Sequence, residues 1–364
     1  MSRLKGAIIG YGFISSQGHL PAYLKRDDVE IVAVADVCEA RRHLVPQIIP
    51  NARIYTDYES LLTSESLDFV DIATPPYAHA EIARMALCQG FHVLCEKPLT
   101  ATTQEARMLL EQAQRSERVI FPCHNYKHAP VVKAIQSVVS QGSIGKVRSL
   151  TLSTFRNTHA KGVSEWRPHW RRDSAVAGGG IAMDHGSHTF YLTFDWLQDY
   201  PVSVTAKMQN TDKEFDTEDN LSAVLTFPKG HACVHLTWTA GVRKVIYTVQ
   251  GDQGAVTVDD DRLEIARMEK KESDENAPGT VSWNIERKDI SSHWMDASHV
   301  QWFNSLFDRF LHAIQENQYA GKEAEEAYRC VELIEACYQS AAQGCREISL
   351  KGWDRAPVLP SLSR

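Results

Sequence analysis

The first 122 residues alternate short β-branched apolar runs with helical patterns, and this alternation constrains the fold more than any other feature of the chain. The runs typical of strands cover residues 5–9, 30–35, 68–73, 91–95 and 118–122. Apolar residues at helical spacing fill the intervals, as in 78–89 and 103–116. Strands that alternate with helices are typical of a doubly wound parallel sheet, so residues 1–122 are predicted to form an α/β domain.

From about residue 146 the pattern changes to longer segments in which polar and apolar residues take turns, as in 231–238. Such alternation is typical of strands that bury one face. Strands are expected at 147–156, 202–209, 219–227, 231–240, 243–250 and 254–258, and closing helices at 300–315 and 322–342. Because the connections between these strands are short, residues 123–364 are predicted to form an α+β domain with a mostly antiparallel sheet.

Two further expectations concern the surface of this second domain. The stretch from Met268 to Gly279 is dense in Lys, Glu, Asp and Asn and is expected to be a solvated loop or hairpin tip. The alternating face of the sheet is more than a single chain is expected to cover, which predicts a homo-oligomer, either a dimer or a tetramer.

Charge and hydropathy exclude several classes of partner. Lys and Arg number 39 against 46 Asp and Glu, and the net charge of -7 is spread along the chain without basic runs, so nucleic acid is not expected as a partner. No apolar run approaches the ~18 residues that a membrane-spanning helix needs. The chain opens directly as a strand, without a region typical of a signal peptide. We therefore expect no membrane association and a cytoplasmic location.

The strand at 5–9 runs into the turn Gly10-Tyr11-Gly12-Phe13-Ile14-Ser15, which opens a predicted helix. The first glycine permits the tight turn, and the second lets the backbone approach a pyrophosphate at the helix N-terminus. Ser15 stands where such turns usually carry Gly or Ala, and it is small enough to preserve the packing of helix on strand. Many ordinary strand-to-helix connections match this pattern. The following strand, however, ends in Asp36, at the spacing where a carboxylate receives the adenosine ribose hydroxyls of a dinucleotide.

Asp36 also bears on the choice of cofactor. Its charge repels the 2′-phosphate of NADP and accepts both ribose hydroxyls of NAD, so NAD is favoured. Arg41 and Arg42 follow closely, and one of them could turn toward a phosphate. NADP is therefore kept as the alternative cofactor.

Two loops follow predicted strands at the edge of the sheet where open α/β folds bind ligands. The first is Ala73-Thr74-Pro75-Pro76-Tyr77-Ala78-His79, which its two prolines make stiff. The second is Cys95-Glu96-Lys97-Pro98, in which Pro98 fixes the loop that presents Lys97. A lysine at this edge can meet a substrate oxygen, although a single Glu-Lys pair is more often an ordinary surface pair.

The segment Gly178-Gly179-Gly180-Ile181-Ala182-Met183-Asp184-His185-Gly186-Ser187-His188 is the densest in chemical groups. In a regular helix Asp184 and His188 lie on one face, where a carboxylate and an imidazole can share the hydroxyls of a ligand. His185 is expected to point elsewhere. His185 and His188 could form half of a metal site, but no third ligand lies near them, and the eight cysteines form no Cys-x-x-Cys pair. No metal is therefore predicted, and the cysteines are expected to be reduced thiols.

The glycine turn, the Thr74-Pro75-Pro76-x-x-His79 loop, the Glu96-Lys97-Pro98 motif and the Gly178 to His188 segment resemble, in order and spacing, the glucose-fructose oxidoreductase, inositol dehydrogenase and MocA family. The resemblance covers residues 5 to about 250. It implies an NAD(P)-dependent dehydrogenase with a Rossmann domain followed by an α/β domain whose open sheet packs against another subunit.

Carried over position by position, the resemblance implies that Lys97, Asp184 and His188 are the catalytic residues. We expect His188 to take the hydroxyl proton, Lys97 to polarise that oxygen, and Asp184 to bind a neighbouring hydroxyl and orient His188. The expected cofactor-binding residues are Gly10, Gly12, Phe13, Ile14, Asp36, Thr74, Pro75, Pro76, His79, Glu96, Lys97 and Asn125; the expected substrate contacts are Tyr126, Trp166 and His169. Lys127 stands where the family often carries an arginine, which leaves the contacts there open.

These residues predict an NAD-preferring enzyme that transfers a hydride between nicotinamide and a secondary alcohol or ketone of a small polyhydroxylated substrate, such as a sugar, a sugar derivative or an inositol. Two alternatives stay open. In one, the same hydride step is transient and leads to oxidation, elimination and reduction, which cleaves a glycoside without net use of NAD. In the other, the chain is a nucleotide-binding regulator without turnover.

Overall fold

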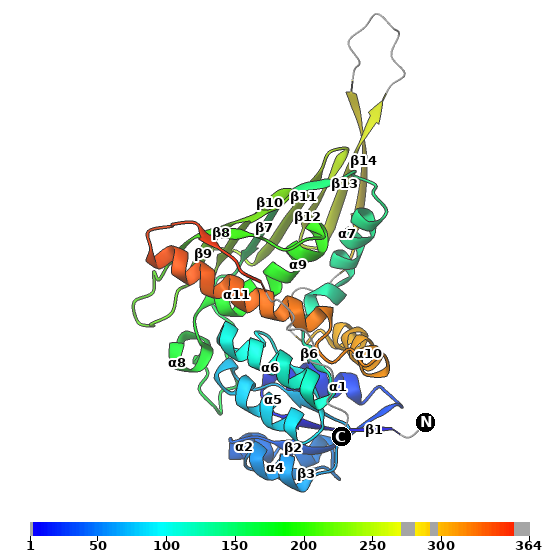
Figure 1. The fold of residues 1–364 in the computed structure, drawn as a ribbon, viewed down its shortest axis with the longest axis vertical. Helices are drawn as coiled ribbons and strands as arrows, with labels where there is room; N and C mark the ends of the chain where they lie inside the picture. The colour runs from blue at the N-terminus through cyan, green and yellow to red at the C-terminus, as the bar shows by residue number, and fades with distance from the viewer. Residues whose placement is uncertain (1–2, 271–280, 292–297, 353–364) are drawn as a thin grey trace, which may run out of the picture.

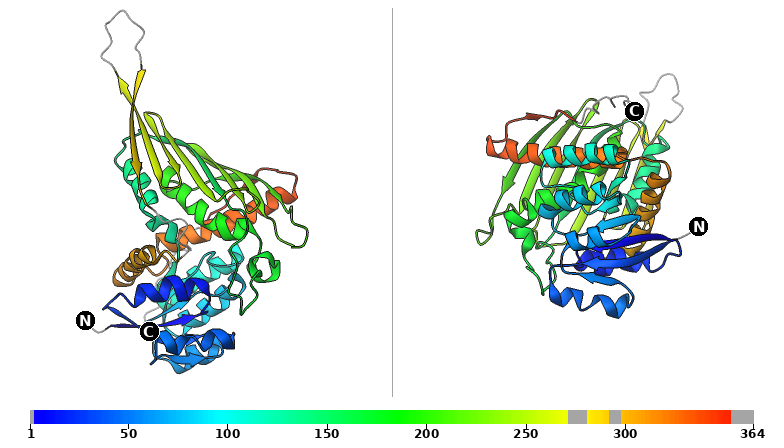
Figure 2. Two further views of the ribbon diagram at one scale, coloured as in Figure 1. Left: turned by 180° about the vertical axis from the view of Figure 1, so that it is seen from behind. Right: turned by 60° about the horizontal axis from the view of Figure 1, so that its bottom comes forward.

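The computed structural model describes residues 3–270, 281–291 and 298–352, which fold into two joined domains (Figure 1). The N-terminal part is a six-stranded parallel sheet, sheet A, with helices on its faces. The second part is a nine-stranded open sheet, sheet B, which rises from the first and carries helices on one face (Figure 2). The predicted fold class is therefore confirmed.

Sheet A has the strand order β3-β2-β1-β4-β5-β6, and all of its pairings are parallel. Its strands are β1 (Leu4–Ile9), β2 (Val29–Ala35), β3 (Arg53–Tyr55), β4 (Phe69–Ile72), β5 (His92–Cys95) and β6 (Ile120–Pro122). The prediction missed β3, which has three residues and buries none of them. The strand order reverses between β1 and β4, so the carboxyl ends of these strands open the crevice where such sheets bind ligands.

The helices around sheet A begin with a π-helical turn that follows the glycine turn. They are η1 (Ser15–His19), α1 (Leu20–Tyr23), α2 (Glu39–Arg42), α3 (Val45–Ile48), α4 (Tyr58–Ser64), η2 (Pro76–Ala78), α5 (His79–Cys88) and α6 (Thr103–Ser116). Local sequence sets α6: the Thr102 hydroxyl accepts from the backbone of Glu105, whose carboxylate accepts from the backbone of Thr102. This capping box satisfies two amide groups at the helix start and fixes the predicted boundary.

Sheet B has the order β14-β13-β12-β11-β7-β10-β9-β8-β15, in which only β7 and β10 pair in parallel among the described strands. Its strands are β7 (Val147–Phe155), β8 (Ser203–Gln209), β9 (Asn220–Phe227), β10 (Gly230–Thr237), β11 (Lys244–Gly251), β12 (Gly254–Asp259), β13 (Arg262–Lys270), β14 (Val281–Asp289) and β15 (Ile348–Ser349). The expectation of a solvated loop or hairpin tip from Met268 was wrong for Met268, Glu269 and Lys270, because these residues belong to β13 and pair with β14. Residues 271–280 of that expectation lie outside the described residues.

The helices of the second part lie on one face of sheet B and between the two sheets (Figure 2). They are η3 (Asn125–His128), α7 (Pro130–Ser140), η4 (Trp170–Arg172), α8 (Ser174–Ala177), η5 (Ala182–Gly186), α9 (Ser187–Leu197), α10 (Val300–Gln315) and α11 (Lys322–Ala342). The structure places α10 and α11 at the predicted residues. The prediction had no helix at α7, whose buried stripe includes Val131, Val132 and Ile135.

Two helices from the end of the chain tie the domains together. Phe307 and Phe310 of α10 pack on Phe69 of sheet A. Helix α11 buries Tyr328 in the core beside sheet A and Leu333 in the core beside sheet B. The division into residues 1–122 and 123–364 stays a prediction, but α10 shows that the second segment completes the first core. Within the described part of the chain, no helix is both long and apolar enough to cross a membrane.

Candidate active site

A cavity of about 690 Å³ lies where the carboxyl ends of sheet A meet the loops of the second domain. Its walls contain most of the predicted site residues: Gly10, Gly12, Phe13, Ile14, Asp36, Thr74, Pro75, Pro76, Glu96, Lys97, Asn125, Tyr126, Trp166, Asp184 and His188. Two predicted residues, His79 and His169, are not among the residues that line it. Segments far apart in the sequence therefore meet around this one cavity, termed the chamber.

The glycine turn forms one end of this chamber. Gly10 has a φ of +94°, and a Cβ on it would lie 2.8 Å from the backbone of Ala73 on the neighbouring loop. Gly12 differs, because a Cβ there would meet no atom within 4 Å, and the residue faces the cavity. The Ser15 hydroxyl donates to the Gly10 carbonyl at 2.7 Å, so serine at the third position holds the turn closed. Gly10 is thus required by the backbone conformation and the close approach of Ala73, whereas Gly12 leaves space for a ligand in the cavity.

Asp36 lies beside the turn at the end of β2. Its carboxylate accepts from the backbone N–H groups of Tyr11 at 2.6 Å and Cys38 at 2.7 Å. A carboxylate has about four acceptor positions, so the oxygens that face the cavity can still accept from ribose hydroxyls. Arg41 is held beneath the turn, where it donates to the Tyr11 carbonyl at 2.8 Å, and Arg42 donates to the Asp36 carbonyl.

Two buried polar atoms in the chamber lack an internal partner. Thr74 Oγ1 and Asn125 Oδ1 are buried and have no hydrogen-bond partner among the described residues. Both residues line the cavity, so both atoms are available to a polar ligand there. Together with the open backbone at Gly12 and the carboxylate of Asp36, these atoms fit a dinucleotide cofactor such as NAD, which would lie along the sheet edge.

His79 does not line the cavity but lies behind the residues that do. It is fully buried, and its ring nitrogens lie 2.8 Å from the Pro98 carbonyl oxygen and 2.7 Å from the Thr74 carbonyl oxygen. The residue thereby joins the Thr74 loop to the Lys97 loop. Its place in the motif is explained by this bridge.

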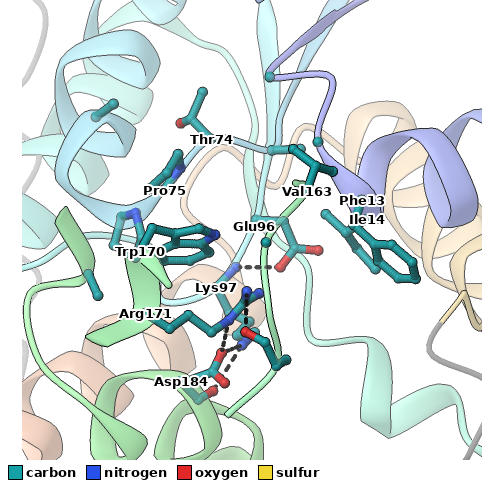
Figure 3. Close-up of a pocket in the computed structure, with 18 of the residues that line it drawn as sticks. Phe13, Ile14, Thr74, Pro75, Glu96, Lys97, Val163, Trp170, Arg171 and Asp184 are labelled. Carbon is teal, nitrogen blue, oxygen red and sulfur yellow. Dashed lines mark hydrogen bonds and ion pairs between the residues drawn. The ribbon is translucent and has the colours of Figure 1, made fainter. Parts of the chain in front are cut away.

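Lys97 and Asp184 form the centre of the chamber (Figure 3). Lys97 Nζ donates to the Asp184 carboxylate at 2.8 Å and to the carbonyl of the same residue at 2.9 Å. Arg171 Nε lies 3.3 Å from the same carboxylate oxygen. Burial alone would raise the pKa of Asp184, but Lys97 and Arg171 outweigh burial and hold that pKa well below its usual range. Asp184 is therefore a carboxylate that fixes the lysine ammonium.

The segment that carries Asp184 departs from a regular helix, and this corrects one expectation. Residues Ala182–Gly186 form the π-helical turn η5, after which α9 begins. A π turn takes in more residues than an α turn and changes the direction of the side chains within it. His185, which was expected to point elsewhere, instead lines the cavity with its Nδ1 3.2 Å from Asp184 Oδ2.

Asp184 was expected to orient His188, but the structure places a tyrosine hydroxyl beside the imidazole instead. Its Nδ1 lies 3.0 Å from the Tyr191 hydroxyl, whose oxygen accepts from the backbone N–H of Tyr126 at 3.2 Å. The Tyr126 ring stacks on the imidazole with ring centroids 4.0 Å apart. Burial and then the charge of Lys97 hold the pKa of His188 well below its ordinary value. His188 is therefore a neutral imidazole with a fixed orientation.

A charged network lies under the floor of the chamber. His19 Nδ1 contacts Asp71 at 2.7 Å, its Nε2 contacts Glu96 at 3.1 Å, and the Tyr23 hydroxyl donates to Asp71. Burial by itself would lower the pKa of His19, but the two carboxylates raise it to about 10. Among the described residues, only His19, Glu96 and Cys123 bring metal-ligand atoms together, within 4.8 Å. Both His19 nitrogens are already used by carboxylates, so the group forms a hydrogen-bonded network.

Of the remaining predicted substrate contacts, Trp166 and His169, only Trp166 lines the cavity. His169 lies behind it, with its Nδ1 2.9 Å from Nε2 of the lining residue His159. Lys127 points away from the cavity and contacts Asp195 at 3.0 Å and the carboxylate of Glu326. The lysine that replaces the family's arginine is therefore part of a buried ion cluster.

Sequence reasoning assigned no role in this site to Arg156, Arg171 or Tyr191. Tyr191 follows His188 by three positions on a helix, which is a spacing that could have indicated the contact. Arg156 comes directly after β7 and lines the cavity. Nothing in the local sequence shows that this arginine lines the cavity, because the cavity forms only where the two domains pack together.

Two family models match the chain over most of its length. Residues 4–124 match the description "Oxidoreductase family, NAD-binding Rossmann fold", and residues 136–350 match "Oxidoreductase family, C-terminal alpha/beta domain". Among curated proteins, the D-apiose dehydrogenase of Paraburkholderia graminis is 26% identical, with 100% of this chain and 94% of that protein covered. The D-glucoside 3-dehydrogenase of Escherichia coli is 24% identical, with 95% and 97% covered.

Solved structures share the fold. A structure described as GenD2 from gentamicin A biosynthesis in complex with NAD has a TM-score of 0.80 at 24% identity, and 97% of each chain is covered. A levoglucosan dehydrogenase in complex with NADH and L-sorbose has a TM-score of 0.79 at 20% identity, with 96% of this chain and 99% of that chain covered. From these matches and the motifs that line the cavity, we conclude that the chain belongs to the glucose-fructose oxidoreductase, inositol dehydrogenase and MocA family of NAD-binding oxidoreductases.

Proposed function

We propose that the protein is an NAD-dependent dehydrogenase or reductase that acts on a secondary alcohol or ketone of a sugar, a sugar derivative or an inositol. The observation that carries the proposal is the meeting of Lys97, Asp184 and a neutral His188 in the same cavity as the glycine turn. The names of the apiose, glucoside and levoglucosan dehydrogenases support the choice of a polyhydroxylated substrate.

A bound nicotinamide would supply the hydride acceptor or donor, and the protein side chains would control the proton and the substrate oxygen. An ammonium group has three N–H donors, and Lys97 uses two of them on Asp184. The third is available to the oxygen of the reacting carbon. Because Asp184 holds the ammonium in place, that donor is aimed before the substrate arrives.

His188 would act as the base for alcohol oxidation and as the acid for ketone reduction. A neutral imidazole with one nitrogen beside the Tyr191 hydroxyl leaves Nε2 to take the proton of the substrate hydroxyl. Tyr191 is fully buried and burial raises its pKa well above the ordinary value, so it stays protonated while it positions the ring.

The proposal is tested by absorbance in the reduced-nicotinamide band with NAD or NADP and a panel of sugars, sugar acids and inositols. Lys97→Met, which keeps the length of the side chain and removes its charge, is expected to lose turnover while NAD binding persists. The matched control is Lys25→Met, because Lys25 is exposed just after α1 and does not line the cavity. Equal loss of turnover in both variants, or no loss in Lys97→Met, would contradict the assignment.

We also propose that sheet B packs on a second copy of the chain to form a dimer or tetramer. On the face opposite its helices, the exposed apolar side chains Val224, Trp283 and Ile285 lie on β9 and β14. Exposed apolar surface on a sheet face favours association. A monomeric mass by light scattering at micromolar concentration would remove this proposal.

A further inference from the structure

The basic side chains Lys97, Arg156, Arg171 and Arg243 line the cavity that holds Asp184. Lys97 and Arg171 both bind the one carboxylate of Asp184, so that carboxylate faces two cations. Burial, and then the charge of Arg156, lower the pKa of Arg243, while Tyr126 and Asp260 act in the opposite direction.

Arg156 is the most informative of these residues. Its side chain is buried, with 8% of the residue exposed, yet its guanidinium donates only to main-chain carbonyls among the described residues, those of Phe155 at 2.9 Å and Lys244 at 3.4 Å. No carboxylate of the described residues lies within 4 Å of its guanidinium. A buried cation without a counter-charge is costly, and a bound anion would remove that cost.

The position of Arg156 is set by the sheet. Its backbone N–H donates to Thr237 at 2.9 Å and its carbonyl accepts from Ala240 at 3.0 Å, so the residue extends the pairing of β7 and β10. Its charge also lowers the pKa of His185, after burial, and His185 contacts Asp184. Arg156 therefore faces the chamber from a rigid element, close to the residues proposed to hold the reacting oxygen.

We propose that the substrate is an anionic polyol, whose carboxylate or phosphate binds Arg156 while its reacting hydroxyl lies at Lys97 and His188. This inference rests on the proposed function and narrows its substrate class. An oxyanion is the group that a planar guanidinium recognises best, since both can share two hydrogen bonds. A neutral sugar would leave the guanidinium without such a partner.

The test compares matched pairs of ligands on the NADH-bound protein, with quenching of NADH fluorescence as a readout that needs no turnover. The probes are D-glucose with D-gluconate, D-glucuronate and D-glucose 6-phosphate. We expect the anions to bind about tenfold to a hundredfold more tightly than glucose, and this preference to weaken as salt rises. Tighter binding by the phosphate than by the acids would assign a phosphate, and the reverse would assign a carboxylate.

Two variants isolate the role of Arg156. In Arg156→Gln the ratio of anion affinity to glucose affinity is expected to fall about tenfold or more. Arg262→Gln removes the same charge from a residue whose side chain is 83% exposed on β13, and the ratio should stay that of the wild type. Circular dichroism and NADH binding report whether each variant is folded.

The outcomes separate this inference from the proposed function. Equal binding of glucose and its acids, or an unchanged ratio in Arg156→Gln, would overturn the anionic substrate and leave the dehydrogenase proposal in place. Binding of NADH without binding or turnover of any polyol, neutral or anionic, would overturn both. Retention of the preference by Arg156→Lys, with weaker binding, would support a charge-based site.

Discussion

The two glycines of the turn should respond to the same substitution in opposite ways. Gly10→Ala forces a side chain into a conformation with φ of +94° and places its Cβ 2.8 Å from the Ala73 backbone. The left-handed conformation costs about 1–2 kcal/mol for a residue with a Cβ, which is about 1–3 °C in Tm for a chain of 364 residues at ~2.1 cal/mol/K of unfolding entropy per residue. Gly12→Ala places its Cβ in open space, so the fold should keep its stability or gain up to about 1 kcal/mol.

Affinity for NAD should fall in Gly12→Ala, the variant that keeps its stability. The new methyl of Gly12→Ala projects toward the cavity where the pyrophosphate is expected, so the Kd for NAD should rise about tenfold or more, equal to about 1.4 kcal/mol. Thermal unfolding without ligand and calorimetric titration with NAD measure both quantities on both variants. Unchanged NAD affinity in a stable Gly12→Ala protein would refute the placement of the cofactor on this turn.

Three further predictions concern the buried charges and the base. Because the folded-state pKa of His19 is about 10 and the unfolded value is about 6.5, its stabilisation is complete below pH 6.5 and is lost as pH rises toward 10. Asp71→Asn, which removes one of the two carboxylates that raise this pKa, should flatten that alkaline loss in chemical denaturation; an equally steep loss would contradict the network. Asp184→Asn should lower kcat about a hundredfold, with NAD affinity within about twofold in calorimetry, because Lys97 loses its anchor. Tyr191→Phe should lower kcat about tenfold and shift the acid limb of the pH profile of kcat/KM, and a changed KM with an unmoved limb would argue for a structural role only.

Much of the first domain could be predicted from the sequence because its signals are local. The β-branched runs, the capping box of α6 and the glycine turn each act within a few residues. Parallel strands then bring their carboxyl ends to one edge, which is why the Thr74 and Lys97 loops could be expected to meet. The short strand β3 escaped prediction because it is held by pairing with β2 and has no apolar run of its own.

The parts that were missed depend on contacts between distant segments. The π turn at Ala182–Gly186 brings His185 into the cavity, and helical periodicity gives no sign of it. The orientation of His188 comes from Tyr191, although a carboxylate was the expected partner. Helix α10 was placed correctly along the chain, but its packing against sheet A depends on aromatic contacts across more than 200 residues of sequence.

The most direct test of the central claim follows the hydride itself. The protein is incubated with NAD and a sugar or sugar acid that carries deuterium on its carbons, and the reduced cofactor is analysed by mass spectrometry. The account predicts one deuterium on the nicotinamide in the wild type and none above background in Lys97→Met. Reduced cofactor without deuterium, or NAD that stays oxidised while substrate is bound, would contradict direct hydride transfer from the substrate carbon in this cavity.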